Sequence, residues 1–578
     1  MRRFGLGRGG RGGASLWVCL LLAACGAEPS TGIVVGGGDA LGDAGDGVAV
    51  GDWISGGNDA LATAETDAAA EAAADATADA DAVADAVAAA DADAAADAAA
   101  DADASDSSAS ADAAECDGSC DALTPDGGVN GDADSAADGA DAPTEPEPLW
   151  DVPLIENKGD ATCVFSNQHS GFKDGVSLDV WNLDYVSYES VGGKLQKIAI
   201  KAFAARPKGS GVLPGVVQAH GLGGFAKESH ATGLAALTGA FVIAYTGPGG
   251  GDASDNTSQG LPSGHDSGKR MFDVFPDIRG SWFWGHAMAA RRAVTCLTTR
   301  PDVDPSRLGI TGFSAGGVTS FLVGGADARI KAAVPLSGVL AWDVATQSAN
   351  AWQHVLLQKA GYSVQSAAWQ KLMAELIGPS VALANSNKAL YLVNGSSDEF
   401  FPLTAGAATY AAWKGPKRQS VVGNFDHGVY QAYGAALPGG TSKITEDADL
   451  RARGAQRALF HHIFGTDGTY AVLPEAPDAA FQQLGPLVYI AVTPKPSTFA
   501  LESVTLWWTL DKAKTWLHVD LEKQGGLWTK QLPSGPPPGT VWYVDAVYKT
   551  SGLLPDRFSV STNPAIPSGF VPDIWGMP

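Results

Sequence analysis

Short apolar runs alternate with longer segments of helical periodicity between residues 215 and 464. Six runs predict strands, at 215–220, 241–245, 307–311, 330–336, 389–394 and 419–422. The segments with helical periodicity are 228–237, 282–297 and 446–464. Strands that are apolar along their length and alternate with helices indicate a largely parallel sheet with helices on both faces. The sequence therefore predicts an α/β domain.

Two further segments complete this domain. Alternating apolar and polar residues at 185–189 and 195–200, joined through Val191-Gly192-Gly193, predict a hairpin at the start of the sheet. A longer helical segment, 342–377, is inserted between two predicted strands. Insertions at such a point can roof an active site. We place the whole α/β domain at 149–480.

The pattern changes after residue 464 to short strands separated by glycine and proline turns. These strands are predicted at 487–492, 504–510, 516–521, 527–531 and 541–548. They predict a small β-sandwich of immunoglobulin-like type over 486–578. Its tryptophans are expected to fill the core of the sandwich and its seam with the α/β domain, and the alternative is a platform that stacks on carbohydrate. They are Trp507, Trp508, Trp516, Trp528 and Trp542.

The N-terminus has the pattern of an export signal over residues 1–24. Arginines precede an apolar run, 16–24, that is too short to span a bilayer as a helix. The run ends in Leu22-Ala23-Ala24-Cys25, which resembles the lipobox of bacterial lipoproteins and implies lipidation of Cys25. Gly26 follows, where retention at the inner membrane would use aspartate, so an outer-membrane or surface position is expected. The alternative is ordinary signal cleavage near this point.

Residues 25–148 are composed mostly of Ala, Asp, Gly, Ser and Thr. They hold nearly half of the 64 acidic residues and no Lys or Arg, so the rest of the exported chain is close to neutral. A segment this poor in large apolar groups cannot offset its ordering entropy, and we predict a disordered tether. Without a basic surplus, a nucleic-acid partner is not expected. Calcium binding at 130–134 is a weaker alternative, because the ligand spacing is incomplete.

Four cysteines lie outside the signal and the lipobox. Cys116, Cys120, Cys163 and Cys296 allow three disulfide pairings, which an exported location permits. The Cys-x-x-x-Cys pair at 116 and 120 has no nearby histidines, so a metal site is not expected. We predict structural or incidental roles.

A candidate nucleophile lies at the end of an apolar strand. Gly312-Phe313-Ser314-Ala315-Gly316 follows that strand and precedes a helix of small residues. This is the local pattern of a nucleophile elbow, in which glycines flank a serine held in a strained turn. In a chain with 72 glycines a Gly-x-Ser-x-Gly motif can arise by chance, so its assignment as a nucleophile depends on the other motifs of the chain.

A candidate acid and a candidate base follow in order. Asp398 comes after the strand 389–394, and His427 comes after the strand 419–422. Chain order Ser, Asp, His is that of the α/β-hydrolases. Glu399 and Asp426 are alternative acids. The alternative bases are His220, which fits an oxyanion loop better, and His286, His461 and His462, while His230 and His265 are weaker candidates for lining a cleft.

Residues 196–464 resemble the α/β-hydrolase family, especially its acetyl xylan esterase, dienelactone hydrolase-like and prolyl-oligopeptidase-type members. The motifs that carry the resemblance are His220-Gly221-Leu222 after the third strand, the Ser314 turn, the Asp398 loop, the His427 loop and the 275–282 segment. The resemblance implies that Ser314 attacks an acyl carbonyl, His427 moves its proton, and Asp398 orients the imidazole. It also implies an oxyanion hole from the N–H groups of Leu222 and Ala315.

These expectations combine into an extracytoplasmic serine ester hydrolase that needs no metal or cofactor. Carbohydrate acetyl esters are one candidate substrate class. The first alternative is a peptidase of prolyl-oligopeptidase type, although such enzymes usually carry Tyr where this chain has Ala315 and a propeller upstream. The second alternative is a non-catalytic surface-binding lipoprotein on a hydrolase scaffold.

Overall fold

The computed structural model describes residues 148–573, except 210, 253–255, 264–267, 428–439, 533–534, 538 and 551–555; over 440–450 it describes the backbone only. The predicted signal, Cys25, the tether, the 130–134 segment, Cys116 and Cys120 lie outside the described residues, as does His265. The described residues from Trp150 onward belong to one compact unit.

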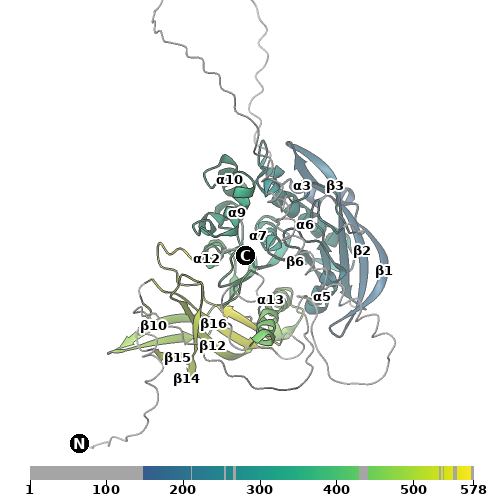
Figure 1. The fold of residues 1–578 in the computed structure, drawn as a ribbon. Helices are drawn as coiled ribbons and strands as arrows, with labels where there is room; N and C mark the ends of the chain where they lie inside the picture. Colours follow the sequence, from purple (N-terminus) through teal and green to yellow (C-terminus); the bar gives the residue numbers. More distant parts are fainter. Residues whose placement is uncertain are drawn as a thin grey trace, which may run out of the picture. The chain divides into compact units, whose positions relative to one another are not determined.

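A nine-stranded sheet forms the centre of the α/β domain (Figure 1). Its order is β1-β2-β3-β5-β4-β6-β7-β8-β9, antiparallel up to β5 and parallel beyond it. The predicted, mostly parallel sheet is therefore confirmed. Its strands are β1 Val164–Lys173, β2 Val176–Val191, β3 Lys194–Pro207, β4 Leu213–Ala219, β5 Phe241–Tyr245, β6 Val303–Phe313, β7 Ile330–Leu336, β8 Ala389–Gly395 and β9 Lys417–Val422.

The first strands differ from the prediction in length and number. The predicted hairpin exists as β2 and β3, whose turn uses Gly192 and Gly193 at φ +58° and +78°. The strand β1 was not predicted, because most of its side chains are exposed and give no apolar alternation. The strand before His220, β4, is therefore the fourth strand along the chain, not the third.

Helices pack on the sheet as two pairs. One pair is α6 (Trp282–Thr299) with α7 (Ala315–Ala326), and the other is α5 (Glu228–Thr238) with α13 (Gly440–Phe464). Figure 1 shows the pairs on opposite sides of the strands, as predicted. Across the described part of the chain, no helix has the length and apolar character needed to cross a membrane.

The insertion after β7 is helical, as predicted for 342–377. It is built from short pieces, α8 Trp342–Ala345, α9 Trp352–Lys359, α10 Ala367–Leu372, a π-helical turn Met373–Ile377 and α11 Pro379–Ala382. Three tryptophans hold the pieces together, since the Trp342 ring lies 6.1 Å from that of Trp352 and 6.4 Å from that of Trp369. The helix α12 (Leu403–Ala412) then follows β8 and packs on α8.

The C-terminal module, residues 478–573, contains two four-stranded antiparallel sheets. Their orders are β10-β11-β15-β14 and β13-β12-β16-β17. The strands are β10 Asp478–Leu484, β11 Leu487–Thr493, β12 Ala500–Thr509, β13 Leu517–Asp520, β14 Glu522–Gln524, β15 Leu527–Leu532, β16 Val541–Lys549 and β17 Arg557–Ser561. The predicted start at 486 needs correction, because β10 pairs with β11. An immunoglobulin-like arrangement stays a prediction.

Two tryptophans of the module lie in its core rather than on a surface platform. Trp516 is buried in a cluster with Leu403 and Val421 of the α/β domain, and Trp507 packs against the same cluster. Trp508, Trp528 and Trp542 are half-buried. The core-filling interpretation therefore holds for Trp507 and Trp516.

A disulfide joins Cys163, just before β1, to Cys296 in α6. The two residues are 133 positions apart, so the bond closes a long loop across the first half of the domain. This rules out the two pairings in which either residue bonds to Cys116 or Cys120.

Candidate active site

Ser314 occupies the turn between β6 and α7 in a backbone conformation that favours glycine, with φ +58° and ψ −119°. Its N–H donates to the Leu336 carbonyl at 2.9 Å. A Cβ atom on Gly312 would come within 2.6 Å of the Gly316 carbonyl carbon, and one on Gly316 within 2.7 Å of the Ala219 carbonyl carbon. Both glycines are therefore required for the close approach of strand, turn and helix. This is the elbow geometry that the sequence predicted.

The structure brings Ser314, His427 and Asp398 together in one hydrogen-bonded chain. Nε2 of His427 lies 2.9 Å from Oγ of Ser314, and Nδ1 lies 3.1 Å from Oδ1 of Asp398. A carboxylate only accepts, so Nδ1 carries the proton and Nε2 is free to accept from the serine hydroxyl. This protonation state is the one that a general base needs.

Asp398 is held firmly at the end of this chain. Its side chain is fully buried, and Oδ1 also accepts the main-chain N–H groups of Phe400 at 2.9 Å and Phe401 at 2.8 Å. These donors stabilise the ionised carboxylate in the protein interior. Both contacts of the His427 Nδ1 atom go to Asp398, whereas Glu399 accepts the main-chain N–H of His427 instead.

The pKa of His427 lies above its ordinary value. Burial lowers this pKa, but the charge of Asp398 and its hydrogen bond, together with the charges of Glu399 and Asp426, outweigh burial. The pKa of Glu399 is raised to about 7, first by burial and then by the neighbouring charge of Asp398. The site therefore holds an imidazole and a carboxyl group whose pKa values are both raised.

Aromatic rings shield the imidazole of His427. The ring centroids of Phe400, Phe313 and Phe401 lie 4.2, 5.1 and 5.5 Å from it, and the first ring is stacked. His427 and Ser314 are only 9% and 8% exposed. Hydrogen bonds are electrostatically stronger in such surroundings. Sequence reasoning did not assign these phenylalanines a role, although two of them directly follow the predicted acid loop.

His220 supports a loop and is not bonded to the serine. Its Nδ1 donates to the Gly221 carbonyl at 2.6 Å, and its Nε2 accepts the N–H of Gly247 at 2.8 Å. Burial lowers the pKa of His220 to about 4, so the ring stays neutral. These two bonds fix the turn that carries Leu222.

The other candidate histidines are bonded to groups away from Ser314. Nδ1 of His286 pairs with the Thr319 hydroxyl at 2.7 Å in the interior. His461 and His462 lie on α13 and bond to Thr466 and to the Tyr470 carbonyl. His230 is in the first turn of α5, and burial lowers its pKa to about 4.

The two predicted oxyanion donors belong to segments that border the serine. Ala315 is the first residue of α7, so its N–H has no acceptor within the helix. Leu222 follows Gly221, where an added Cβ atom would lie 3.4 Å from Cβ of Ser314. The main chain before Leu222 therefore passes next to the candidate nucleophile.

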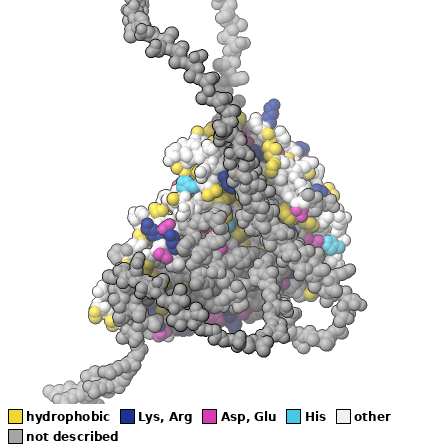
Figure 2. All heavy atoms as spheres, in the orientation of Figure 1, with side chains coloured by type: hydrophobic (Ala, Val, Ile, Leu, Met, Phe, Trp, Pro, Cys, Tyr) yellow, Lys and Arg dark blue, Asp and Glu magenta, His cyan; other side chains and the backbone are white. Residues whose placement is uncertain are grey.

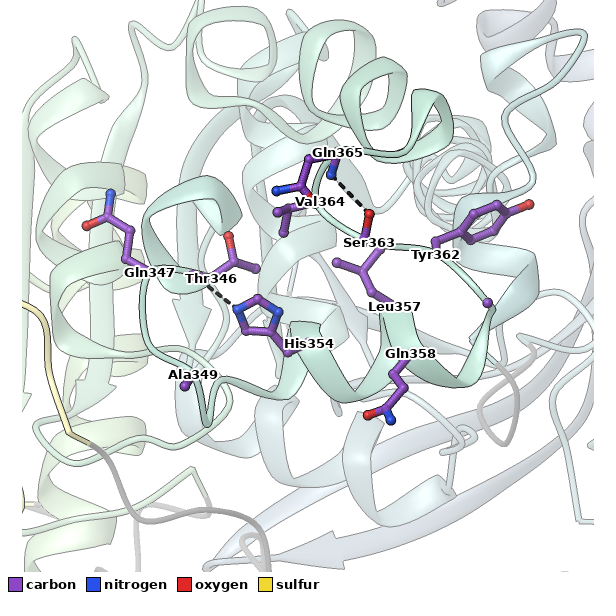
Figure 3. A pocket seen from close by; sticks show the side chains of 11 residues that line it. Thr346, Gln347, Ala349, His354, Leu357, Gln358, Tyr362, Ser363, Val364 and Gln365 are labelled. Atoms are coloured by element: carbon purple, nitrogen blue, oxygen red, sulfur yellow. Dashed lines mark hydrogen bonds between the residues drawn. The ribbon is translucent and has the colours of Figure 1, made fainter.

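A separate hollow of about 690 Å³ lies on the helical insertion (Figure 3). The imidazole of His354 lies in the middle of the view and donates to the Thr346 carbonyl at 2.7 Å. Three glutamines, Gln347, Gln358 and Gln365, contribute to its wall, and the described residues that line it include no Lys, Arg, Asp or Glu. The wall thus combines amide and hydroxyl groups with apolar side chains, Leu357 and Val364 among them.

The comparisons with known proteins agree with this fold. Residues 178–436, just under half of the chain, match the model of the family described as acetyl xylan esterase (AXE1). This part of the chain is an α/β-hydrolase domain. The protein is a serine hydrolase of the carboxylesterase type. No curated protein matches the chain.

Several solved structures resemble the chain at low identity. The acetyl xylan esterase from Paenibacillus sp. R4 is 18% identical, with a TM-score of 0.39 over 51% of this chain and 90% of that chain. Acetyl xylan esterase 1 from Thermoanaerobacterium sp. JW/SL YS485 is 19% identical, with a TM-score of 0.38 over 50% and 88%. Est1E from Butyrivibrio proteoclasticus, solved with ferulic acid, is 16% identical, with a TM-score of 0.31 over 45% and 95%.

Proposed function

We propose that the protein hydrolyses carboxylic esters through an acyl-enzyme formed on Ser314. The observation that carries this proposal is the continuous chain of hydrogen bonds from Ser314 through His427 to the buried Asp398. In such a chain the serine hydroxyl loses its proton to the imidazole as it attacks.

The two half-reactions follow from these positions. Oγ of Ser314 forms a bond to the ester carbonyl carbon while Nε2 of His427 takes the hydroxyl proton. The resulting oxyanion accepts hydrogen bonds from the N–H groups of Ala315 and Leu222, and the imidazolium then protonates the departing alcohol. Water attacks the acyl-enzyme in the second half, with His427 again as base, and releases the acid.

We propose acetylated carbohydrate as the substrate class. The family match over residues 178–436 supports this choice. The hollow on the insertion also offers amide and hydroxyl groups, which suit a neutral polyol, and the residues that line it are separate from Ser314, Asp398 and His427. The hollow lies along α9. The Trp352 ring of this helix lies 5.2 Å from the Phe400 ring, and Phe400 stacks on His427.

We further propose that the enzyme acts outside the cytoplasm, tethered through a lipid on Cys25. The charged and apolar pattern of residues 1–24 supports export. The disulfide between Cys163 and Cys296 supports it independently, since disulfides persist in oxidising compartments. Cys25→Ala should move the protein from the membrane fraction to the soluble fraction, and retention in the membrane would refute the lipid anchor.

The function is tested with the full chain on p-nitrophenyl acetate, a longer-chain p-nitrophenyl ester, acetylated xylan and a peptide anilide. We expect the wild type to release acetate from p-nitrophenyl acetate and from acetylated xylan. Ser314→Ala should lose this activity. If the peptide anilide were cleaved in preference to the esters, the assigned function would be that of a peptidase and not of an esterase. Ester hydrolysis at the wild-type rate by Ser314→Ala would refute the mechanism.

A further inference from the structure

The loop that carries His427 is bonded directly to the C-terminal module. Nδ2 of Asn424 donates to the Trp516 carbonyl at 2.9 Å, and the N–H of Trp516 donates to Oδ1 of Asn424 at 2.7 Å. Both polar atoms of one amide side chain are therefore satisfied by the main chain of one residue. Asn424 is 8% exposed and lies three positions before His427.

The same segment of the module reaches the loop that carries Asp398. The N–H of Asn424 donates to Oγ of Ser396 at 2.9 Å, and the N–H of Ser397 donates to the Phe425 carbonyl at 3.0 Å. The Ser397 hydroxyl in turn donates to the Ala513 carbonyl at 3.4 Å. The acid loop and the base loop are thus bonded to each other and to residues 513–516.

Packing at this point leaves no space for displacement. A Cβ atom on Gly423 would come within 2.6 Å of Cη2 of Trp507, so the loop passes directly under that ring. Trp516 shares one buried cluster with Val421 of β9 and Leu403 of α12. These two elements flank the loops, so the loops and the module share a single core.

We propose that the C-terminal module is a structural part of the active site and that Asn424 is its positioning residue. The proposal rests on the proposed function, because it assigns to the Asn424–Trp516 pair the task of fixing His427 relative to Ser314 and Asp398. A displacement of about 1 Å between reacting groups can cost on the order of 100-fold in rate. Loss of this pair should therefore reduce catalysis more than substrate binding.

The test compares Asn424→Gly with a matched control, Gln419→Ala, in the full chain. Glycine accepts the φ of +60° at position 424, so this variant removes the amide without adding backbone strain. Gln419 is also a buried amide that crosses to the module, where it bonds to the Thr562 carbonyl at 3.0 Å, but it lies within β9 and away from both loops.

We expect Asn424→Gly to lower kcat at least tenfold with KM within twofold of wild type, and to slow reaction with a fluorophosphonate by a similar factor. The kcat of Gln419→Ala should stay within twofold of wild type, even if its Tm falls as much as that of Asn424→Gly. Equal kcat losses in the two variants, or a wild-type rate in Asn424→Gly, would overturn the proposal. If wild type did not react with the fluorophosphonate, the proposed function itself would fail, which is a different result.

A second pair of variants tests the packing. Gly423→Ala should push the loop from Trp507 and lower kcat at least tenfold, and the added Trp507→Leu should restore most of the lost rate by making space. A Gly423→Ala variant with wild-type kcat would contradict the proposal, as would a double variant that regains Tm but no activity.

Discussion

The main-chain N–H of His427 donates to Oε2 of Glu399 at 3.0 Å. Glu399 is 3% exposed and directly follows Asp398, so two carboxyl groups lie beside one imidazole. Burial and the charge of Asp398 raise the pKa of Glu399 to about 7. The proton of Glu399 is therefore lost within the pH range in which His427 must be neutral to act as a base.

Glu399→Gln should flatten the dependence of stability on pH. A carboxyl group whose pKa rises on folding contributes stability that is complete below its unfolded value of 4.5 and is lost as pH rises through about 7. The wild type should lose up to about 3 kcal/mol from this group between pH 4.5 and 8. Urea unfolding of both proteins at pH 5 and pH 8 measures the difference, and identical pH dependence in the two proteins would contradict the assignment.

The pH profile of kcat/KM should rise with an inflection above 6.5. The protonated imidazole cannot accept the serine proton, and Asp398 holds the pKa of His427 above its ordinary value in spite of burial. Asp398→Asn should lower kcat about 10³- to 10⁴-fold, because it removes the charge and favours the wrong tautomer. Initial rates on p-nitrophenyl acetate between pH 5 and 9 provide the measurement. An activity that increases as pH falls would be inconsistent with His427 as base.

His220→Ala should reduce kcat by about 10- to 100-fold without removing an inflection from the pH profile. Its ring bonds both to the Gly221 carbonyl and to the Gly247 N–H, so its loss frees the turn before Leu222 and weakens an oxyanion donor. The ring is neutral throughout, since burial lowers its pKa to about 4. Wild-type kcat in this variant would show that the turn is held by other contacts.

Removal of the disulfide should lower stability without altering the chemistry. The bond between Cys163 and Cys296 closes a loop of 133 residues, for which chain entropy predicts at most about 5 kcal/mol. The double variant Cys163→Ala with Cys296→Ala should therefore unfold at a lower temperature, with kcat within twofold at 25 °C. An unchanged Tm would indicate that the bond contributes no net stability.

The elements that position Ser314 could be predicted because each depends on local sequence. The turn needs glycine at 312 and 316, and the strands β5, β7 and β8 are apolar along nearly their whole length. Asp398 and His427 were predicted from their place after β8 and β9, although only the last two residues of β9 are apolar. The order Ser314, Asp398, His427 along the chain then indicated which residue is the nucleophile, which the acid and which the base.

The contacts that hold the site could not be predicted in the same way. Asn424 and Trp516 are 92 positions apart, and neither residue has a local pattern that signals its partner. The strand β1 is mostly exposed, and β10 alternates weakly, so periodicity missed both. The role of Glu399 depends on burial, which the sequence Asp398-Glu399 does not reveal.

The most direct test of the account is labelling of the full chain by a fluorophosphonate, followed by intact-mass and peptide mass spectrometry. We expect one label per molecule, on Ser314, with no label in Ser314→Ala and a large reduction in His427→Ala. A label on another residue, or equal labelling of wild type and Ser314→Ala, would contradict the claim that Ser314 is the nucleophile.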